Sequence, residues 1–447
     1  MTGVREIWGW GRWPRRACAV ARPASPDAAA QAAARGPELI ARGLGRSYGA
    51  PAMNPRLTLD MTGCDRILGF DPQTGAVTAE AGVSLGDLIA HFLPRGWFPA
   101  VTPGTKFVTL GGAIGSDVHG KNHHDAGSFG DHVDWFDLAL ASGEVARCSR
   151  TENADLFNAT LGGMGLTGVI LRAQVRLRAV ETGYFRQRTV VAGNLDAAIA
   201  AFEDNYHVPY SVAWIDVLAR GAARGRSLIY LADHARAAEL PRHLGDPLGP
   251  PRKRPKTVPM DAPNGALNGL SVKAFNKLYY AKGAKAPETA FVDWDTYMYP
   301  LDSLLHWNRI YGRRGFAQYQ AVIPLATARD ALDEQLAAIA GAGMGSFLAV
   351  LKRMGPGAPE RPFSFPMEGY TLALDFPLSS AALTLMDRLD EITLAAGGRL
   401  YLAKDARMTQ RTFERGYPEG RAAFDALARR DAAAPRFRSI QSEGLGL

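Results

Sequence analysis

Histidines and one lysine in this sequence stand in settings where they could handle protons or stabilise charge. Four of the nine histidines, His119, His123, His124 and His132, lie in one short glycine-rich stretch, and Lys404 stands near the C-terminus. An imidazole can accept a proton near neutral pH or orient a hydroxyl group. An ammonium can stabilise negative charge that develops during a reaction. These residue types therefore suit proton transfer and electrostatic stabilisation at one centre.

The histidine spacing also raises the question of a metal site. Zinc takes three or four nitrogen, sulfur or carboxylate ligands with further support around them. The stretch from His119 to His124 has no cysteine beside it and no His-Glu-x-x-His pattern. We expect no metal, and we interpret His123, His124 and His132 as histidines that form hydrogen bonds within a tight loop.

Glycine-rich turns surround these residues. One run is residues 42–49, a second is 103–120, and a third is 161–168. Glycines let backbone N–H groups approach an anion without a Cβ in the way, so we expect two of these loops to hold one extended, phosphate-bearing ligand. The runs lack a Walker lysine and the third glycine of a dinucleotide fingerprint. The alternative is a chance cluster of turns in a chain with 48 glycines.

The elements that must position these loops alternate along the chain. Short β-rich runs separated by turns over residues 37–59 and 67–81 predict hairpins and small mixed sheets. Ser84 is expected to cap a helix over residues 85–92, and residues 168–180 predict a buried strand. Further on, helical spacing over 195–202, 326–340 and 380–396 alternates with strands over 316–324 and 371–376. A stripe of Leu383, Met386, Leu389 and Ile392 is expected to pack in the core.

Several of these segments carry a family resemblance. Residues 42–49, 103–124 and 162–168 resemble the vanillyl-alcohol-oxidase type of FAD-binding fold, with an FAD-binding domain of the PCMH type. Within it, the chain is similar to the decaprenylphosphoryl-β-D-ribose 2′-oxidase family over nearly its whole length, and the string His-Gly-Lys-Asn-His-His is the most specific part. The resemblance implies an α+β flavoprotein: an FAD-binding domain at 1–182, an inserted α+β substrate domain at 183–398 with a mobile loop at about 250–285, and a return to the FAD domain at 399–447.

The resemblance also implies roles for individual residues. His119 would lie over the flavin and take or orient a proton, and Lys404 would stabilise the reduced flavin or a developing alkoxide. The expected FAD contacts are Arg42, Gly43, Leu44, Gly45, Arg46, Ser47, Tyr48, Gly104, Thr109, Leu110, Gly111, Gly112, Ser116, Asp117, Val118, His119, Ile170 and Tyr401. The expected substrate contacts are Lys121, Trp214, Gln318, Gln320, Lys352 and Ala373. Relatives that tether the flavin covalently from the first loop use a histidine where this chain has Arg46, so we expect non-covalent FAD.

Two departures from the family pattern affect specificity. Where mycobacterial members carry a cysteine in the strand before Asp-Phe-Pro, this chain has Ala373, and a nearby asparagine is Thr371. These residues suggest a relative from another bacterial lineage, and they leave the pocket shape and the exact substrate open.

Composition limits the class of protein and its partners. The 447 residues include 51 Lys and Arg against 44 Asp and Glu, a net charge of +7 that favours an anionic substrate or membrane face over nucleic acid. Three widely spaced cysteines predict no disulfide framework. No apolar run is long enough to span a bilayer, and the stretch after Arg15-Arg16 is too short for a signal peptide. We expect a cytoplasmic or peripheral inner-membrane protein that touches the membrane through the basic loop 250–256.

Three functions compete at this stage. The first is an FAD-dependent oxidase that converts the 2′-hydroxyl of a polyprenyl-phosphoryl ribose to a ketone, with a separate short-chain reductase completing epimerisation to the arabinose donor for cell-envelope glycans. The second is a soluble aldonolactone or alditol oxidase of the same fold. The third, a non-catalytic flavin-binding subunit of a glycan-assembly complex, is disfavoured because both His119 and Lys404 are present.

Overall fold

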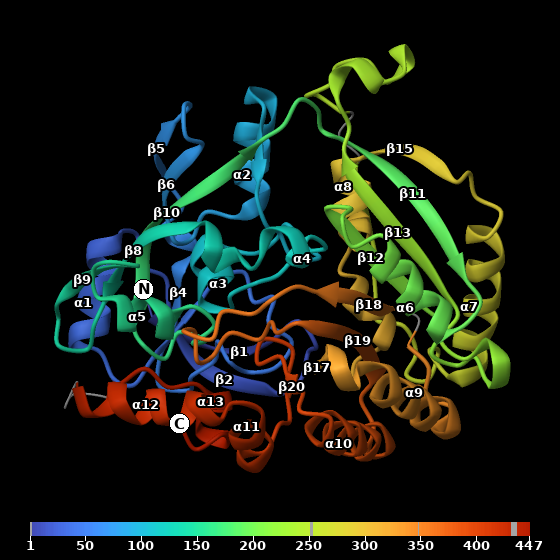
Figure 1. The fold of residues 1–447 in the computed structure, drawn as a ribbon. Coiled ribbons are helices and arrows are strands. Elements are labelled where there is room, and N and C mark those ends of the chain that lie inside the picture. Colours follow the sequence, from blue (N-terminus) through green and yellow to red (C-terminus); the bar gives the residue numbers. More distant parts are fainter. Residues whose placement is uncertain (1, 251–253, 347, 431–435) are drawn as a thin grey trace.

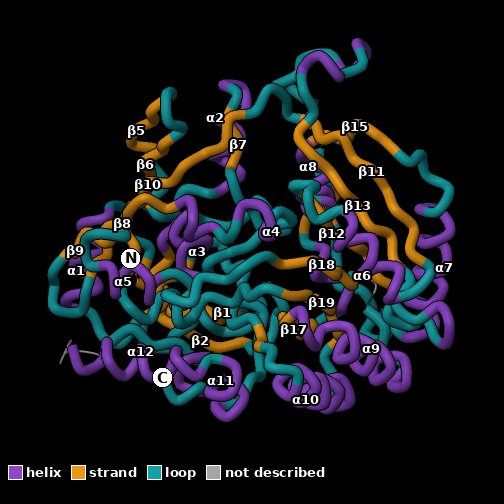
Figure 2. Tube along the Cα trace, in the orientation of Figure 1, coloured by secondary structure: helices purple, strands orange, loops and turns teal. Residues whose placement is uncertain are grey.

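A computed structural model describes residues 2–250, 254–346, 348–430 and 436–447 of the chain. Within these residues the strands form sheets of four, six and eight strands, with one further pair of short strands. The first two sheets occupy the left half of Figure 1 and the eight-stranded sheet the right half. Figure 2 shows helices along the lower edge of both halves.

The four-stranded sheet is mixed, as the short runs predicted. Its strands are β1 (Thr2–Trp8), β2 (Arg15–Ala21), β3 (Ile40–Arg42) and β4 (Thr58–Asp60), in the order β1-β2-β4-β3. Strands β1 and β2 are antiparallel, whereas β4 runs parallel to both β2 and β3. Helix α1 (Pro26–Arg35) connects β2 to β3, and the Ser25 side chain caps it by accepting a hydrogen bond from the Ala28 N–H. The first glycine-rich loop leaves directly from β3.

The six-stranded sheet supplies the second glycine-rich loop. Its strands are β5 (Ile67–Asp71), β6 (Ala76–Glu80), β7 (Trp97–Pro99), β8 (Val133–Ala139), β9 (Val145–Ser149) and β10 (Val169–Ala179). The predicted hairpin is present, because β5 and β6 pair in antiparallel fashion. Around the sheet lie α2 (Leu85–Phe92), α3 (Leu110–Gly115), α4 (His123–Ala126) and α5 (Ala154–Thr160). Ser84 is the N-cap of helix α2 as predicted, with a reciprocal capping box to Asp87.

The eight-stranded sheet is antiparallel throughout. Its order is β15-β11-β13-β12-β18-β19-β17-β20. The strands are β11 (Tyr184–Ala192), β12 (Tyr210–Ile215), β13 (Ser227–His234), β15 (Thr289–Asp293), β17 (Phe316–Pro324), β18 (Ala349–Met354), β19 (Gly369–Pro377) and β20 (Arg399–Leu400). One face packs against helices α6 (Leu195–Asp204), α9 (Leu325–Ala342) and α10 (Ser380–Ala395) in a single hydrophobic core. Met386, Leu389 and Ile392 are buried there as predicted, and Leu383 is half-buried.

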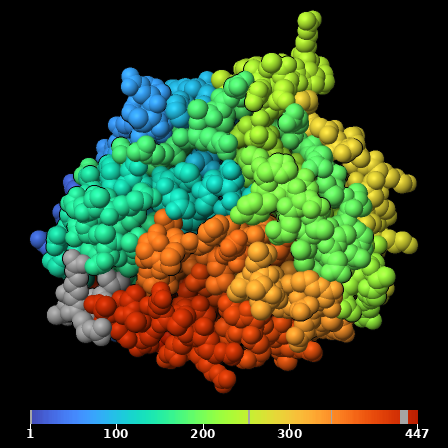
Figure 3. Space-filling model, viewed as in Figure 1, coloured from blue at the N-terminus to red at the C-terminus, as the bar shows by residue number. Residues whose placement is uncertain are grey.

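The remaining elements connect and cover these sheets. They are β14 (Lys256–Thr257), β16 (Leu304–Leu305), α7 (Gly269–Gly283), α8 (Trp294–Met298), α11 (Gln410–Gly416), α12 (Pro418–Arg430) and α13 (Ile440–Gly444). Short 3-10 turns occur at Met61–Gly63, Leu93–Arg95, Phe129–His132, Gly221–Ala223, Ala237–Glu239, Arg242–Leu244, Pro300–Ser303 and Trp307–Tyr311. Figure 3 shows the C-terminal residues, in red, along the bottom of this face, beneath both the teal and the orange segments. None of the described helices has the length and apolar character needed to cross a membrane.

The segment expected to be a mobile loop at about 250–285 needs a correction. Its second half is helix α7, whose start is fixed by the Asn268 side chain, which accepts hydrogen bonds from the N–H groups of Leu270 and Ser271. Two basic residues of the expected membrane loop, Arg252 and Lys253, lie outside the described residues.

Candidate active site

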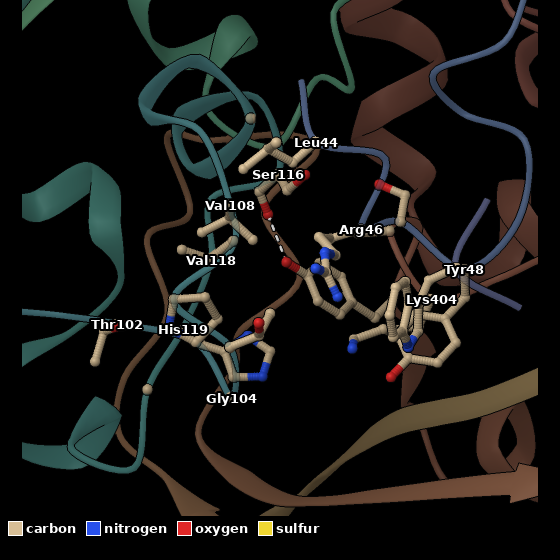
Figure 4. A pocket seen from close by; sticks show the side chains of 18 of the residues that line it. Leu44, Arg46, Tyr48, Thr102, Gly104, Val108, Ser116, Val118, His119 and Lys404 are labelled. Carbon is tan, nitrogen blue, oxygen red and sulfur yellow. Dashed lines mark hydrogen bonds between the residues drawn. The ribbon is translucent and has the colours of Figure 1, made fainter. Parts of the chain in front are cut away.

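A cavity of about 590 Å³ lies between the glycine-rich loops and the open face of the eight-stranded sheet. Strand alternation explains which side chains reach it. Gln318 and Gln320 on β17 line the cavity, whereas Tyr319 between them points into the helix-covered core, where its hydroxyl bonds Thr393 at 2.7 Å. Figure 4 shows His119 and Lys404 at the cavity, contributed by segments far apart in the chain.

The first glycine-rich loop presents backbone donors to this cavity. In the part of the chain that the structure describes, the N–H groups of residues 43–47 donate to no other protein atom. Gly45 has φ +66°, a conformation that glycine adopts without strain, and a Cβ there would lie 2.3 Å from the Arg42 guanidinium. Arg42 in turn donates to the carbonyl oxygen of Trp8 at 2.7 Å, which holds the loop in place. Free N–H groups on a curved backbone are suited to bind the phosphate groups of a dinucleotide.

The second loop forms the facing wall. The Thr109 hydroxyl accepts a hydrogen bond from the Gly112 N–H at 3.2 Å and starts helix α3. Gly104 lines the cavity, and a Cβ built there meets no protein atom within 4 Å, so a side chain would fill space that the cavity now holds. Together the two loops form a glycine-walled cradle, which fits a flat, phosphate-bearing cofactor such as FAD.

Most of the predicted site residues meet at this cavity. The expected FAD contacts that line it are Arg42, Gly43, Leu44, Gly45, Arg46, Ser47, Tyr48, Gly104, Thr109, Gly111, Gly112, Ser116, Val118, His119, Ile170 and Tyr401. Leu110 and Asp117 do not line it. Leu110 is fully buried in the core beneath the loop, and Asp117 accepts hydrogen bonds from the Gly130 N–H and the Ser364 hydroxyl. All six expected substrate contacts, Lys121, Trp214, Gln318, Gln320, Lys352 and Ala373, line the cavity.

His119 lies at the centre of the cavity wall as a neutral imidazole. The Gln320 side-chain amide donates to His119 Nε2 at 3.0 Å, which puts the ring proton on Nδ1. Burial, followed by the positive charge of Lys352, lowers the pKa of His119 well below its usual value. The Nδ1 atom is buried and has no hydrogen-bond partner among the described residues. This geometry makes His119 better suited to orient a hydroxyl than to remove its proton, because an imidazole with so low a pKa is a weak base.

Three lysines converge on the same cavity. Burial lowers the pKa of Lys121 to about 7 and that of Lys352 to about 7, and in each case a neighbouring lysine lowers it further. Burial also lowers the pKa of Lys404, to about 8, while Asp375 raises it. Lys121 donates to the carbonyl oxygen of Tyr297 and lies 4.2 Å from the centre of its ring. Several cations that depress one another's pKa values form a site that gains from binding an anion.

Lys404 lies over an aromatic ring and within the electrostatic influence of Asp375. Its Nζ lies 4.1 Å from the centre of the Tyr48 ring, a cation–π contact. The segment after β20 is a turn, in which the Lys404 N–H donates to the Tyr401 carbonyl oxygen at 2.9 Å. At a pKa of about 8, most of Lys404 is an ammonium at neutral pH.

Asp375 is a site residue to which the sequence analysis gave no role. It is fully buried on β19, and its carboxylate accepts a hydrogen bond from Gln318 Nε2 at 2.5 Å and one from the Tyr311 hydroxyl at 3.3 Å. Burial raises the pKa of Asp375 to about 7, against the opposing influence of Lys404. Asp375 is thus the buried counter-charge of Lys404.

The other histidines of the loop hold the backbone together. His123 Nδ1 accepts a hydrogen bond from the Gly355 N–H at 3.1 Å, and His124 Nε2 bonds the Val208 carbonyl oxygen at 2.8 Å. These partners belong to distant segments, so the prediction of bonds within the loop was wrong for both residues; only His132, which bonds the Ala126 carbonyl oxygen, fits it. A buried imidazole needs a hydrogen-bond partner, and here the nearest backbone groups belong to the segments at Gly355 and Val208, which pack against this loop. No His, Cys, Asp and Glu cluster among the described residues could hold a metal ion.

Comparison with known proteins agrees with this geometry. A family model described as an FAD binding domain matches residues 19–149. A decaprenylphosphoryl-β-D-ribose oxidase of Mycolicibacterium smegmatis is 40% identical over 93% of this chain and 92% of its own length. An L-gulonolactone oxidase of Mus musculus is 31% identical, over 36% of this chain and 37% of its own length. The cradle and these matches define an FAD-dependent oxidoreductase with an α+β fold. The chain belongs to the decaprenylphosphoryl-β-D-ribose oxidase family.

A second relative, from another genus, also matches most of this chain. An uncharacterised protein from the mprA 5′ region of Streptomyces coelicolor is 36% identical over 75% of this chain and 92% of its own length. Both long matches extend beyond the FAD-binding segment, because that segment covers only residues 19–149 whereas each match covers three quarters or more of this chain.

Proposed function

We propose that this protein oxidises the 2′-hydroxyl of a polyprenyl-phosphoryl-β-D-ribose to the 2′-keto sugar. The observation that carries the proposal is the convergence of Lys121, Lys352 and Lys404 with two amides, Gln318 and Gln320, on one cavity beside His119. Ammonium groups suit a phosphate, and amides suit sugar hydroxyls. The substrate named for the Mycolicibacterium smegmatis relative has both chemical groups.

The oxidation removes a hydride from a carbon atom and a proton from its hydroxyl oxygen. FAD, when bound by the two glycine-rich loops, would accept the hydride and, in the net reaction, the hydroxyl proton, so that the alcohol becomes the ketone as FAD becomes FADH₂. His119, kept neutral by burial, orients the hydroxyl through its unpartnered Nδ1–H. The Lys404 ammonium stabilises the negative charge that develops at the reacting centre. Lys121 and Lys352 bind the phosphate, and its charge in turn favours their protonated forms.

A competing activity is oxidation of a free aldonolactone. The mouse L-gulonolactone oxidase matches only about a third of this chain. A free lactone has no phosphate to neutralise the three half-buried lysines of the cavity. The test measures reduction of the bound flavin in the absence of oxygen, monitored as the loss of its visible absorbance. Polyprenyl-phosphoryl ribose should bleach the flavin, and the matching arabinose compound, which differs at the 2′-carbon, should not. Bleaching by a free lactone alone would overturn the proposal.

The 2′-keto product implies a second enzyme and a location. We propose that a separate short-chain reductase delivers hydride to the opposite face of the ketone, which completes epimerisation to arabinose. We also propose peripheral contact with a membrane, because the polyprenyl chain of such a substrate stays in the bilayer. The first proposal is tested by adding the reductase and a nicotinamide cofactor to the oxidised product and looking for the arabinose compound.

A further inference from the structure

Helix α7 is attached to the rest of the protein by a narrow face. Val272 and Asn276 are its buried residues, and Asn276 donates to the Asp216 carboxylate at 2.7 Å. One turn further on, the Tyr280 hydroxyl donates to the Ala192 carbonyl oxygen at 3.2 Å. Residues spaced by four lie on one side of a helix, so this row defines the side that faces the eight-stranded sheet. Figure 1 shows α7 at the right-hand edge of the molecule, outside that sheet.

The opposite side of α7 is an apolar ridge exposed to solvent. Helical spacing puts Leu270, Ala274 and Leu278 on one row, roughly half a turn away from the buried row. Leu270 is 82% exposed and Leu278 is 71% exposed, among the highest values for large apolar side chains in the described residues. Leucines so exposed and so close together on one helix face indicate a surface that another apolar phase covers.

Lysines flank this ridge on both sides. Lys273 and Lys277 lie along one flank and Lys282 along the other, and all three are exposed. Between Asp261 and Glu288 the chain contains four lysines and no acidic residue. Long lysine side chains can extend their ammonium groups toward anionic headgroups while the helix row between them enters the acyl region. The charge of this surface therefore complements an anionic lipid surface.

Aromatic rings connect the helix to the mouth of the cavity. Phe275 stacks on Tyr279, with ring centres 5.6 Å apart, and Tyr279 lies 4.7 Å from Trp214. The Tyr279 and Tyr230 hydroxyls bond each other at 3.1 Å. Tyr279, Tyr230 and Trp214 all line the cavity. A bilayer in contact with α7 would thus adjoin aromatic side chains that line the same cavity as the lysines.

We propose that helix α7 is the membrane-docking element of this protein, lying in the plane of an anionic bilayer with the row Leu270, Ala274 and Leu278 inserted. The inference rests on the proposed function for the identity of the lipid chain that passes along the rings. It assigns the contact to α7 and not to the basic loop 250–256.

The test is co-sedimentation of the full-length protein with vesicles of phosphatidylcholine that contain phosphatidylglycerol. The variant L270S/L278S should lower the partition coefficient about tenfold for each leucine removed from lipid. A matched control, V4S/L68S, changes two exposed apolar residues on β1 and β5, far from α7, and should bind as the parent protein does. FAD retention and the melting temperature of each variant report whether it folds.

A second variant keeps the inference testable if L270S/L278S folds poorly. K273Q/K277Q/K282Q should bind vesicles more weakly at low salt, whereas R254S/K256S, in the basic loop, should not differ from the parent protein. The inference is overturned if the parent protein binds none of these vesicles, or if L270S/L278S binds as the parent does. It is also overturned if the parent is a dimer by size-exclusion chromatography that L270S/L278S dissociates, because a second copy then covers the ridge.

Failure of the proposed function gives a different result. If no polyprenyl-phosphoryl pentose bleaches the flavin but vesicle binding still depends on Leu270 and Leu278, the docking element stands and the substrate assignment falls. The opposite result is that a water-soluble short-chain analogue bleaches the flavin of the parent and of L270S/L278S equally while vesicle binding does not depend on α7. In that case the proposed function stands and the assignment of α7 as the docking element falls.

Discussion

Replacing Asp375 with asparagine should move the alkaline limit of the reaction to lower pH. The Asp375 carboxylate raises the pKa of Lys404, which burial otherwise lowers, to its value of about 8. The charge of Asp375 raises the pKa of Lys404, and a nearby opposite charge typically shifts a pKa by about 1–3 units, so D375N should lower the pKa of Lys404 by about 1 unit. At about pH 7.5 the ammonium fraction of Lys404 would then fall from about three quarters to about one quarter.

The assay is the rate of anaerobic flavin reduction by substrate, measured from about pH 6 to about pH 10. Because Asp375 and Lys404 are coupled, the profile reports the pair, and the parent protein should lose activity as pH rises through about 8. The control is Y311F, which removes a hydrogen bond to Asp375 but keeps its carboxyl group, and the alkaline limit should move less than in D375N. An unchanged limit in D375N, with FAD still bound, would refute the assignment of Asp375 as the counter-charge of Lys404.

Three further predictions test the rest of the site. The variant K404A should keep FAD but reduce it about 10²- to 10³-fold more slowly, as loss of an electrostatic donor does, and a rate within about twofold of the parent would contradict the role. Acid precipitation should leave the yellow colour in the supernatant, since Arg46 stands where a covalent tether would need histidine; colour in the pellet would mean a covalent bond. Substrate binding near neutral pH should take up protons, because the pKa values of Lys121 and Lys352 are about 7 and a bound phosphate raises them. Calorimetry in two buffers of different ionisation enthalpy measures this uptake, which K121M or K352M should reduce, and equal heats in both buffers would count against phosphate binding by these lysines.

Local sequence patterns predicted the parts of this molecule that local forces specify. Strand β17 begins and ends at the residues expected, and Ser84 caps α2 as expected. The glycine-rich loops were recognisable because glycine gathers where a backbone must approach a ligand closely or take a positive φ, as Gly45 does. The domain boundaries remain a proposal; those near 182 and 398 fall in the short connections before β11 and before β20.

Features that depend on distant segments could not be predicted in this way. Asp375 acquires its role only from register, since β17 and β19 pair so that it lies directly opposite Gln318. A signal existed: Thr371, Ala373 and Asp375 share one parity on their strand, as Gln318 and Gln320 do on theirs, so both strands bring polar groups to one face. Helix α7 escaped prediction because its leucines lie on the exposed side, whereas periodicity arguments assume that apolar residues face the core.

Strand β20, the shortest strand of the eight-stranded sheet, affects the order in which parts of this enzyme fold during synthesis. Strand β20 adds to the sheet beside β17, and just beyond it the Ala403 carbonyl oxygen accepts a hydrogen bond from the Tyr48 N–H at 3.0 Å. The first glycine-rich loop is therefore closed by residues that a ribosome makes more than three hundred positions later. Such a high contact order delays closure until the end of synthesis. A nascent chain can form its first two sheets early, but residues 399–403 complete the first glycine-rich loop only when almost all of the chain has emerged, so we expect firm flavin retention to require a nearly complete chain.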